Sequence, residues 1–166
     1  MLSSKVVLVT GACGLIGQQL VRVRLTQYGC ALATDPGTEK SKLRFERLPS
    51  KQVQFAPMDI TEANSIDKAI ANGTEQFGSV DACVNSAYPR SKNWGTVLEY
   101  LTIEDIQEHL KLQLGVAILL SQRIMKHFIS QGHGNLINLS SIQGVAAPKF
   151  EHYEGTSIYS SIEYSV

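Results

Sequence analysis

Short apolar runs of strand length alternate with longer amphipathic segments along the chain. The apolar runs are rich in β-branched residues, as buried parallel strands are. We expect strands at Lys5–Thr10, Cys30–Thr34, Val53–Ala56, Val80–Asn85 and Asn135–Ser141. We expect helices at Leu15–Tyr28, Glu39–Leu48, Glu62–Phe77 and Thr102–Gln131. So regular an alternation predicts an α/β protein with a parallel sheet covered on both faces. Right-handed crossovers make such a sheet doubly wound and Rossmann-like.

Several helix ends carry recognisable signals. Thr61 is in position to be the N-cap of the helix that starts at residue 62. Thr102 and Asp105 have the spacing of a capping box, with Asp in place of the usual Glu. Gly29 is placed to be the C-cap of the first helix, and Gly132 to end the longest one.

Composition narrows the class of partner. The 166 residues contain 15 Lys and Arg against 15 Asp and Glu, which gives no electrostatic reason to expect nucleic acid or an anionic membrane surface. No apolar run approaches the roughly 20 residues that span a bilayer. The N-terminal residues lack the features of a signal peptide, so we expect a cytoplasmic protein with no membrane partner. The three cysteines and four histidines lack metal-ligand spacing, and we expect no metal site.

Three glycines follow the first expected strand with the spacing G-x-x-G-x-x-G. They are Gly11, Gly14 and Gly17, and a helix is expected to start within this stretch. A dinucleotide site needs a tight turn, a close approach of backbone to pyrophosphate, and a helix N-terminus that offers free N–H groups. Strand, glycines and helix occur in the order that supports this interpretation. The cofactor-binding residues predicted in the turn are Gly11, Cys13, Gly14, Leu15, Ile16 and Gly17.

Asp35 ends the second expected strand. At this position in a dinucleotide-binding fold, a carboxylate accepts hydrogen bonds from the adenosine ribose and repels a 2′-phosphate. Asp35 therefore favours NAD(H) over NADP(H) as cofactor. The alternative is that Asp35-Pro36-Gly37 is only a turn, because Asp commonly starts one.

Four ordered motifs resemble the short-chain dehydrogenase/reductase family, in its short-subunit branch. The Thr10–Gly17 stretch is similar to the family's cofactor motif, and Asn138-Leu139-Ser140-Ser141 to its segment with the catalytic Ser. Met58-Asp59-Ile60-Thr61 resembles the segment whose Asp contacts adenine, and Val84-Asn85-Ser86-Ala87 resembles its Asn-Asn-Ala-Gly motif. The resemblance adds Asp59, Ile60, Asn85 and Ala87 to the expected cofactor site. Ser86 and Tyr88 depart from the family's Asn and Gly.

The resemblance also implies the catalytic residues. In the family a Tyr exchanges a proton with the substrate oxygen, a Lys four residues later lowers its pKa, and a Ser, here Ser141, hydrogen-bonds the same oxygen. Tyr153 lies at the usual distance after Ser141, but Ser157 occupies its Lys position. Tyr164 is favoured, with residues 147–162 as an enlarged substrate-side loop, although the chain ends before its Lys position. Gln113 replaces the Asn that holds a proton-relay water in the family.

The resemblance implies an oxidoreductase that acts on a secondary alcohol or ketone. The 147–162 loop resembles a flagellin-modification subgroup linked to surface-sugar biosynthesis, so a sugar derivative is the candidate substrate. The alternative is a catalytically inactive dinucleotide-binding fragment or regulatory module. We expect residues 1–166 to form a single dinucleotide-binding domain without the family's C-terminal strands and helices. The family pairs subunits through the helix at residues 102–131, which implies a homodimer or homotetramer at full length.

Overall fold

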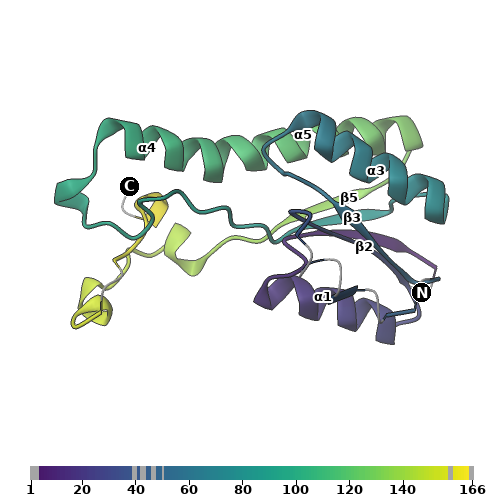
Figure 1. Cartoon of the computed structure of the whole chain (residues 1–166), viewed down its shortest axis with the longest axis horizontal. Helices are drawn as coiled ribbons and strands as arrows, with labels where there is room; N and C mark the ends of the chain where they lie inside the picture. The colour runs from purple at the N-terminus through teal and green to yellow at the C-terminus, as the bar shows by residue number, and fades with distance from the viewer. Residues whose placement is uncertain are drawn as a thin grey trace. The chain divides into compact units, whose positions relative to one another are not determined.

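The computed structural model describes residues 4–38, 41, 44–45, 48–49, 51–156 and 159–164. They form a five-stranded sheet in the order β3-β2-β1-β4-β5, in which every neighbouring pair is parallel (Figure 1). The strands are β1 (Val6–Thr10), β2 (Cys30–Asp35), β3 (Val53–Pro57), β4 (Ala82–Asn85) and β5 (Asn135–Asn138). The predicted α/β class with a parallel, Rossmann-like sheet is confirmed.

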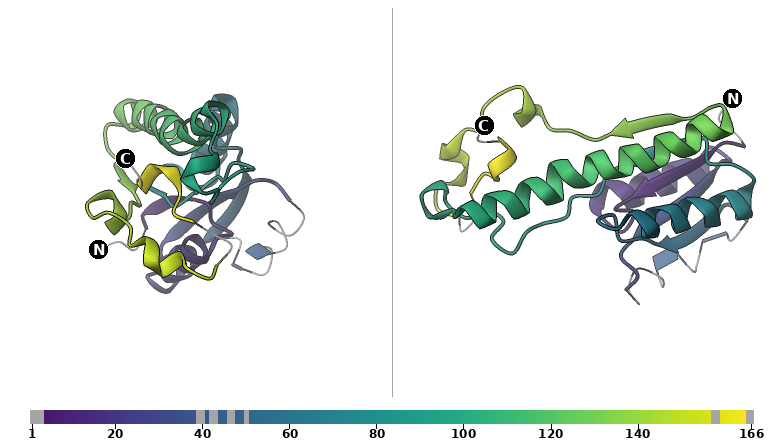
Figure 2. Two further views of the ribbon diagram at one scale, coloured as in Figure 1. Left: turned by 90° about the vertical axis from the view of Figure 1, so that its left-hand side faces the viewer. Right: turned by 90° about the horizontal axis from the view of Figure 1, so that it is seen from above.

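Helices follow the strands in the predicted alternation. They are α1 (Leu15–Thr26), α3 (Ala63–Phe77), α4 (Ile103–Leu110) and α5 (Val116–Gln131). A π-helical segment, Lys111–Gly115, joins α4 to α5, so the single helix expected at residues 102–131 is continuous but locally widened (Figure 2). The helix expected at 39–48 lies mostly outside the described residues; of those described, Ser41, Arg44 and Phe45 are helical.

Two predicted helix ends were wrong, and two were confirmed. Helix α5 ends at Gln131, and Gly132 follows it with a left-handed φ of +86°, as expected. Helix α3 begins at Ala63 with Glu62 as its N-cap, and the Thr61 hydroxyl donates to the Asp59 carboxylate at 2.7 Å. The first helix ends at Thr26, and Tyr28, not Gly29, takes the left-handed conformation with φ +57°. The capping box is formed as expected, with reciprocal hydrogen bonds between Thr102 and Asp105.

The chain divides into two compact units. Unit 1 comprises Met1–Ala87 and Ile118–Leu139 and holds the sheet; unit 2 comprises Tyr88–Ala117 and Ser140–Val166. Unit 2 contains α4 and the 3-10 turns η1 (Leu98–Tyr100), η3 (Ile142–Gly144), η4 (Phe150–Tyr153) and η5 (Ile162–Tyr164). The single domain expected for residues 1–166 stays a prediction.

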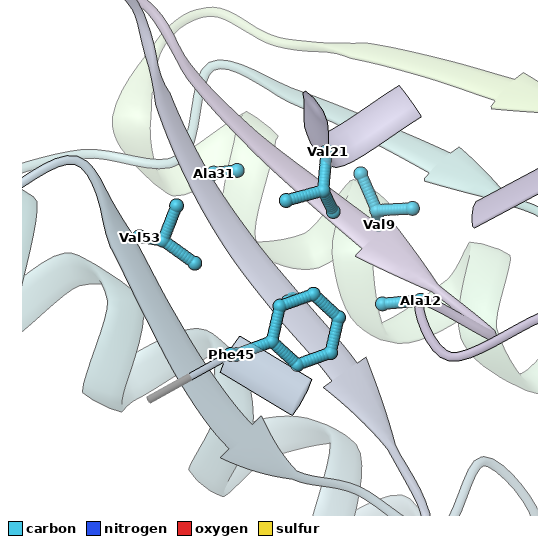
Figure 3. Packing of buried hydrophobic residues seen from close by; sticks show 7 residues of the cluster. Val9, Ala12, Val21, Ala31, Phe45 and Val53 are labelled. Carbon is cyan, nitrogen blue, oxygen red and sulfur yellow. The ribbon is translucent and has the colours of Figure 1, made fainter. Parts of the chain in front are cut away.

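The core of unit 1 has two halves, one on each face of the sheet. Helix α1 covers one face, and α3 and α5 cover the other (Figure 1). On the α1 face, Val9 and Ala31 from the sheet pack with Val21 from α1 and with Phe45 and Val53 (Figure 3). The largest fully buried side chains of the other half include Leu8, Leu32, Ile66, Leu120 and Ile124. Among the described helices, none is long and apolar enough to cross a membrane.

Candidate functional site

The carboxyl ends of the parallel strands meet at one edge of the sheet. Thr10 at the end of β1 pairs with Thr34 of β2 and with Asn85 of β4, and Asn85 pairs with Asn138 of β5. In open α/β sheets, ligands bind outside this edge. The predicted glycine turn leaves the sheet here, directly after β1.

Contacts of the backbone explain two of the turn's glycines. Gly11 has φ +62°, and a Cβ atom there would lie 2.8 Å from the Cα atom of Ala87 and from the carbonyl oxygen of Ser86. A Cβ atom on Gly17 would collide with the carbonyl oxygen of Gly11. The start of α1 therefore packs directly on the turn, as a close helix–strand arrangement requires.

The N-terminus of α1 is open toward solvent. Gly14 is its N-cap, with an extended backbone and no side-chain capping hydrogen bond, and its first turn has no acidic residue. The side chains of Leu15 and Ile16 are exposed, which leaves the backbone N–H groups of this turn uncovered by apolar packing. Free N–H groups and the positive end of the helix dipole favour an anion at this position.

Asp35 and Arg44 both contact the turn. The Cys13 N–H donates to Asp35 Oδ2 at 2.9 Å, so this N–H is already occupied in the chain. Arg44 Nη1 donates to the Cys13 carbonyl oxygen at 2.6 Å and lies 3.4 Å from Gln18 Oε1. Sequence reasoning missed Arg44 as a site residue because these partners lie 31 and 26 residues away in the chain.

The environment of Cys13 favours the protonated form of its thiol. Burial raises the pKa of Cys13, and the nearby Asp35 carboxylate adds to the rise, against a lowering hydrogen bond from Ser41. Burial also raises the pKa of Cys83 to about 12. Both thiols are therefore protonated near neutral pH, where only a thiolate would be a nucleophile.

The side chain of Asn85 forms hydrogen bonds between neighbouring strands of the sheet. Its side chain is buried, accepts from the Thr10 hydroxyl at 2.7 Å and donates to Asn138 at 3.1 Å. The N–H groups of Ser86 and Ala87 both donate to Thr10 Oγ1 at 3.2 Å. The ends of three neighbouring strands are thereby held together by side chains, which positions the backbone of Ala87 against Gly11.

Asp59 and Ile60 lie after β3. The Asp59 carboxylate accepts from both the N–H and the hydroxyl of Thr61 at 2.9 and 2.7 Å, and the Asp59 side chain is exposed. Ile60 is 9% exposed and belongs to the core. Any contact of a ligand with Ile60 would therefore involve its backbone.

The predicted catalytic residues all belong to unit 2. Ser141 is the N-cap of η3, where its hydroxyl accepts from the Gln143 N–H at 3.2 Å, and η3 contacts the turn η5 that carries Tyr164. Gln113 lies in the π-helical segment and donates to the Pro89 carbonyl oxygen at 2.6 Å. Tyr153 is half-buried, and its hydroxyl lies 3.5 Å from the Gln143 amide nitrogen.

Metal ligands are not gathered in the described part of the chain. Among its residues, no group of three or more His, Cys, Asp or Glu side chains is placed to hold a metal ion.

Comparison with known sequences gives a consistent result. A family model described as short chain dehydrogenase matches residues 5–161. The chain is 43% identical over 170 residues to the post-translational flagellin modification protein A of Campylobacter coli. It is 27% identical over 146 residues to a 7alpha-hydroxysteroid dehydrogenase of Bacteroides fragilis. The chain spans 66% of the length of the first of these proteins and 56% of the second.

Solved structures agree with the fold. A short chain dehydrogenase from Bacillus anthracis matches with a TM-score of 0.77 and 26% identity, over 89% of this chain and 59% of that one. A short chain dehydrogenase from Mycobacterium smegmatis matches with a TM-score of 0.81 at 24% identity, over 99% of this chain and 64% of that one. The resemblances predicted from the motifs and from the 147–162 loop are thus confirmed at the level of family and relative.

Proposed function

The chain belongs to the short-chain dehydrogenase family, and from this membership we propose that it forms part of an NAD(H)-dependent oxidoreductase. The reaction moves a hydride between the nicotinamide and a secondary alcohol or ketone. The observation that carries the proposal is the open N-terminus of α1, which follows the glycine turn and lies beside the Asp35 carboxylate. NAD(H) would supply the hydride chemistry, while the protein binds and orients the reactants.

The preference for NAD(H) is assigned to Asp35. One carboxylate oxygen is held by the Cys13 N–H, which fixes the side chain at the carboxyl end of β2. A carboxylate held there would accept bonds from the ribose hydroxyls and repel a 2′-phosphate. The guanidinium of Arg44 is already engaged by the turn, so we do not assign it to a phosphate.

Calorimetric titration of NADH and NADPH tests this assignment. The Asp35→Ala change should narrow the preference for NADH by about 1–3 kcal/mol, as expected for lost hydrogen bonds. Arg44→Gln serves as the control and should leave the ratio of the two affinities close to that of wild type. An unchanged ratio in Asp35→Ala would make Asp35 a turn residue only.

For catalysis we propose Tyr164 as the residue that exchanges a proton with the substrate oxygen, and Ser141 as its hydrogen-bond partner. The Ser141 hydroxyl accepts from Gln143, which leaves its own proton free to donate to that oxygen. We propose that Gln113 takes the place of the family's water-holding Asn. Its amide nitrogen donates to the Pro89 carbonyl oxygen, so its amide oxygen is the atom that would accept from the proton-relay water.

Paired variants of a protein that contains this chain and continues past Val166 test the choice of tyrosine. Tyr164→Phe should remove nearly all turnover and leave NADH affinity unchanged. Tyr153→Phe should retain most turnover. The reverse result would assign the reaction to Tyr153, and turnover unaffected by either change would refute both tyrosines. No turnover in the wild type with any alcohol or ketone would favour an inactive dinucleotide-binding module.

The proposed substrate is a sugar derivative with a secondary alcohol or ketone, acted on in the cytoplasm. Support comes from the 43% identity to a flagellin modification protein. We further propose a homodimer or homotetramer. The exposed side chains of Leu110 and Leu114 support it, because large apolar groups on a helix surface commonly mark interfaces. Light scattering coupled to size-exclusion chromatography tests the assembly, and a monomeric full-length protein would refute it.

A further inference from the structure

The loop after β4 carries a stacked cation in unit 2. The Arg90 guanidinium carbon lies 4.1 Å from the centroid of the Trp94 ring and 5.9 Å from that of Tyr88. The two rings meet edge to face, with centroids 6.4 Å apart and planes at 87°. The Trp94 Nε1–H donates to the Tyr88 hydroxyl at 3.1 Å, which ties the rings together. Arg90 is therefore positioned by a rigid aromatic support.

The aromatic support, formed by the rings of Tyr88 and Trp94, is hydrogen-bonded to the segments that carry the proposed catalytic residues. The Tyr88 and Ser161 hydroxyls are 3.1 Å apart, and the Tyr164 N–H donates to the Ser161 carbonyl oxygen at 3.1 Å. Gln113 donates to the carbonyl oxygen of Pro89, which stands between Tyr88 and Arg90 in the chain. The position of Arg90 is thus coupled within unit 2 to the turn with Tyr164 and to the π-helical segment.

Arg90 has no anionic partner in the described part of the chain, where it makes neither a hydrogen bond nor an ion pair. Its side chain is exposed. The Asp105 carboxylate on the neighbouring α4 is occupied by Asn93 and by Thr102. A guanidinium stacked on an aromatic face keeps its N–H edges available, and these edges match the oxygens of phosphate and carboxylate.

We propose that Arg90, on the support formed by Tyr88 and Trp94, binds an oxyanion group of the substrate. The substrate class is then a sugar derivative that carries a phosphate or a carboxylate. The substrate part of this inference rests on the proposed function, whereas oxyanion binding at Arg90 does not. The chain has no net charge, so attraction of an anion depends on this local arrangement.

Trp94 provides a local signal because it is the only tryptophan in these 166 residues. We would titrate the full protein with inorganic phosphate and, separately, with malonate, at constant ionic strength and with NAD⁺ present to occupy the dinucleotide site. The fluorescence of a Trp94→Phe variant is subtracted to isolate the Trp94 signal. Wild type should give a saturable change, and the anion that binds more tightly, phosphate or malonate, identifies the chemistry of the group.

Variants at Arg90 separate binding from general charge effects. Arg90→Gln should weaken the anion about tenfold or more, the effect expected for loss of hydrogen bonds to a charged group. Arg90→Lys keeps the charge but loses the planar fork, and should weaken binding less. Lys92→Gln removes an exposed charge from the same loop and should leave the affinity unchanged. A thermal melt of each variant confirms that it folds.

Equal affinity in wild type and Arg90→Gln would overturn the inference, as would an unsaturable signal in wild type with both anions. Calorimetry with NADH on the same preparations keeps this result apart from the proposed function. Normal NADH binding without anion binding refutes only the Arg90 site. Anion binding that depends on Arg90, in a protein that does not bind NADH, supports the site and refutes the proposed function.

Discussion

The turn between β1 and α1 and the segment 140–164 differ in how firmly the fold determines their residues. In the turn, the backbone atoms of Gly11 and Ala87 leave no space for a side chain at Gly11 or Gly17. In the segment after β5, short 3-10 turns follow one another, and Gly155 has nothing within 4 Å of a hypothetical Cβ atom. Backbone packing therefore specifies the first region, while the second depends on a few side-chain hydrogen bonds.

The largest expected effect comes from placing a methyl group in the turn. Gly17→Ala should lower the free energy of unfolding by about 3 kcal/mol, because the methyl group collides with backbone that cannot move aside. Gly155→Ala meets open space, and its left-handed φ of +73° should cost only about 1 kcal/mol. Urea unfolding followed by circular dichroism gives both values. Equal losses in the two variants would remove the difference between the regions.

The hydroxyls of Thr10 and Thr34, both buried in the sheet, offer a second comparison. Thr10→Val removes the hydroxyl that serves Asn85, Ser86 and Ala87, and should cost about 2 kcal/mol because buried partners lose their bonds. Thr34→Val removes a single bond to the Val9 carbonyl oxygen, at 3.1 Å, and should cost about 1 kcal/mol. The same denaturation assay ranks the two. A larger loss for Thr34→Val would mean that the strand ends are not held by Thr10.

The strands and the glycine turn between β1 and α1, whose residues are specified by backbone packing, could be predicted from the sequence. The strands were located within one to three residues because apolar runs and glycine spacing reflect local rules of the fold. The turn of Gly11, Gly14 and Gly17 was found for the same reason.

Contacts between residues distant in the chain could not be predicted from apolar runs or glycine spacing. Arg44 reaches the Cys13 carbonyl oxygen across 31 residues, and Arg90 stacks on Trp94 in a loop without periodicity. Thr61 was assigned as a cap from its residue type, although the helix begins one residue later than expected, after Glu62. The choice between Tyr153 and Tyr164 depended on a Lys four residues later that neither has in these 166 residues.

The amino end of the sheet should respond to acid through Asp81. Burial opposes ionisation of this carboxyl, but hydrogen bonds from Lys5 and from the Val6 N–H outweigh burial and lower its pKa. A lowered folded pKa contributes stability above the unfolded value of about 3.9, and this contribution is lost as pH falls through the folded pKa.

Asp81→Asn should therefore be less stable than wild type at pH 7, with a difference that shrinks below about pH 4. Denaturation midpoints measured from pH 7 to pH 3 test this. A difference that stays constant over the whole range would show that the charge of Asp81 is not responsible.

The smallest effect is expected in unit 2. Tyr88→Phe removes the hydroxyl that accepts from the Trp94 Nε1–H and lies 3.1 Å from the Ser161 hydroxyl, and should cost about 0.5–1 kcal/mol, the usual net contribution of a hydrogen bond. The emission of Trp94 should shift, which reports the lost bond directly. A loss as large as that of Thr10→Val would show that unit 2 is held as firmly as the turn.

Calorimetric titration of NADH into the wild-type protein and the Gly14→Asp and Gly14→Ala variants tests whether the cofactor binds at the open N-terminus of α1. A Cβ atom at this position lies 3.1 Å from the Gly11 carbonyl oxygen, so Ala adds modest bulk, and Asp adds a negative charge where the pyrophosphate is expected. We expect binding to wild type, weaker binding to Gly14→Ala and none to Gly14→Asp. Equal NADH affinity in wild type and Gly14→Asp, with both folded, would contradict it.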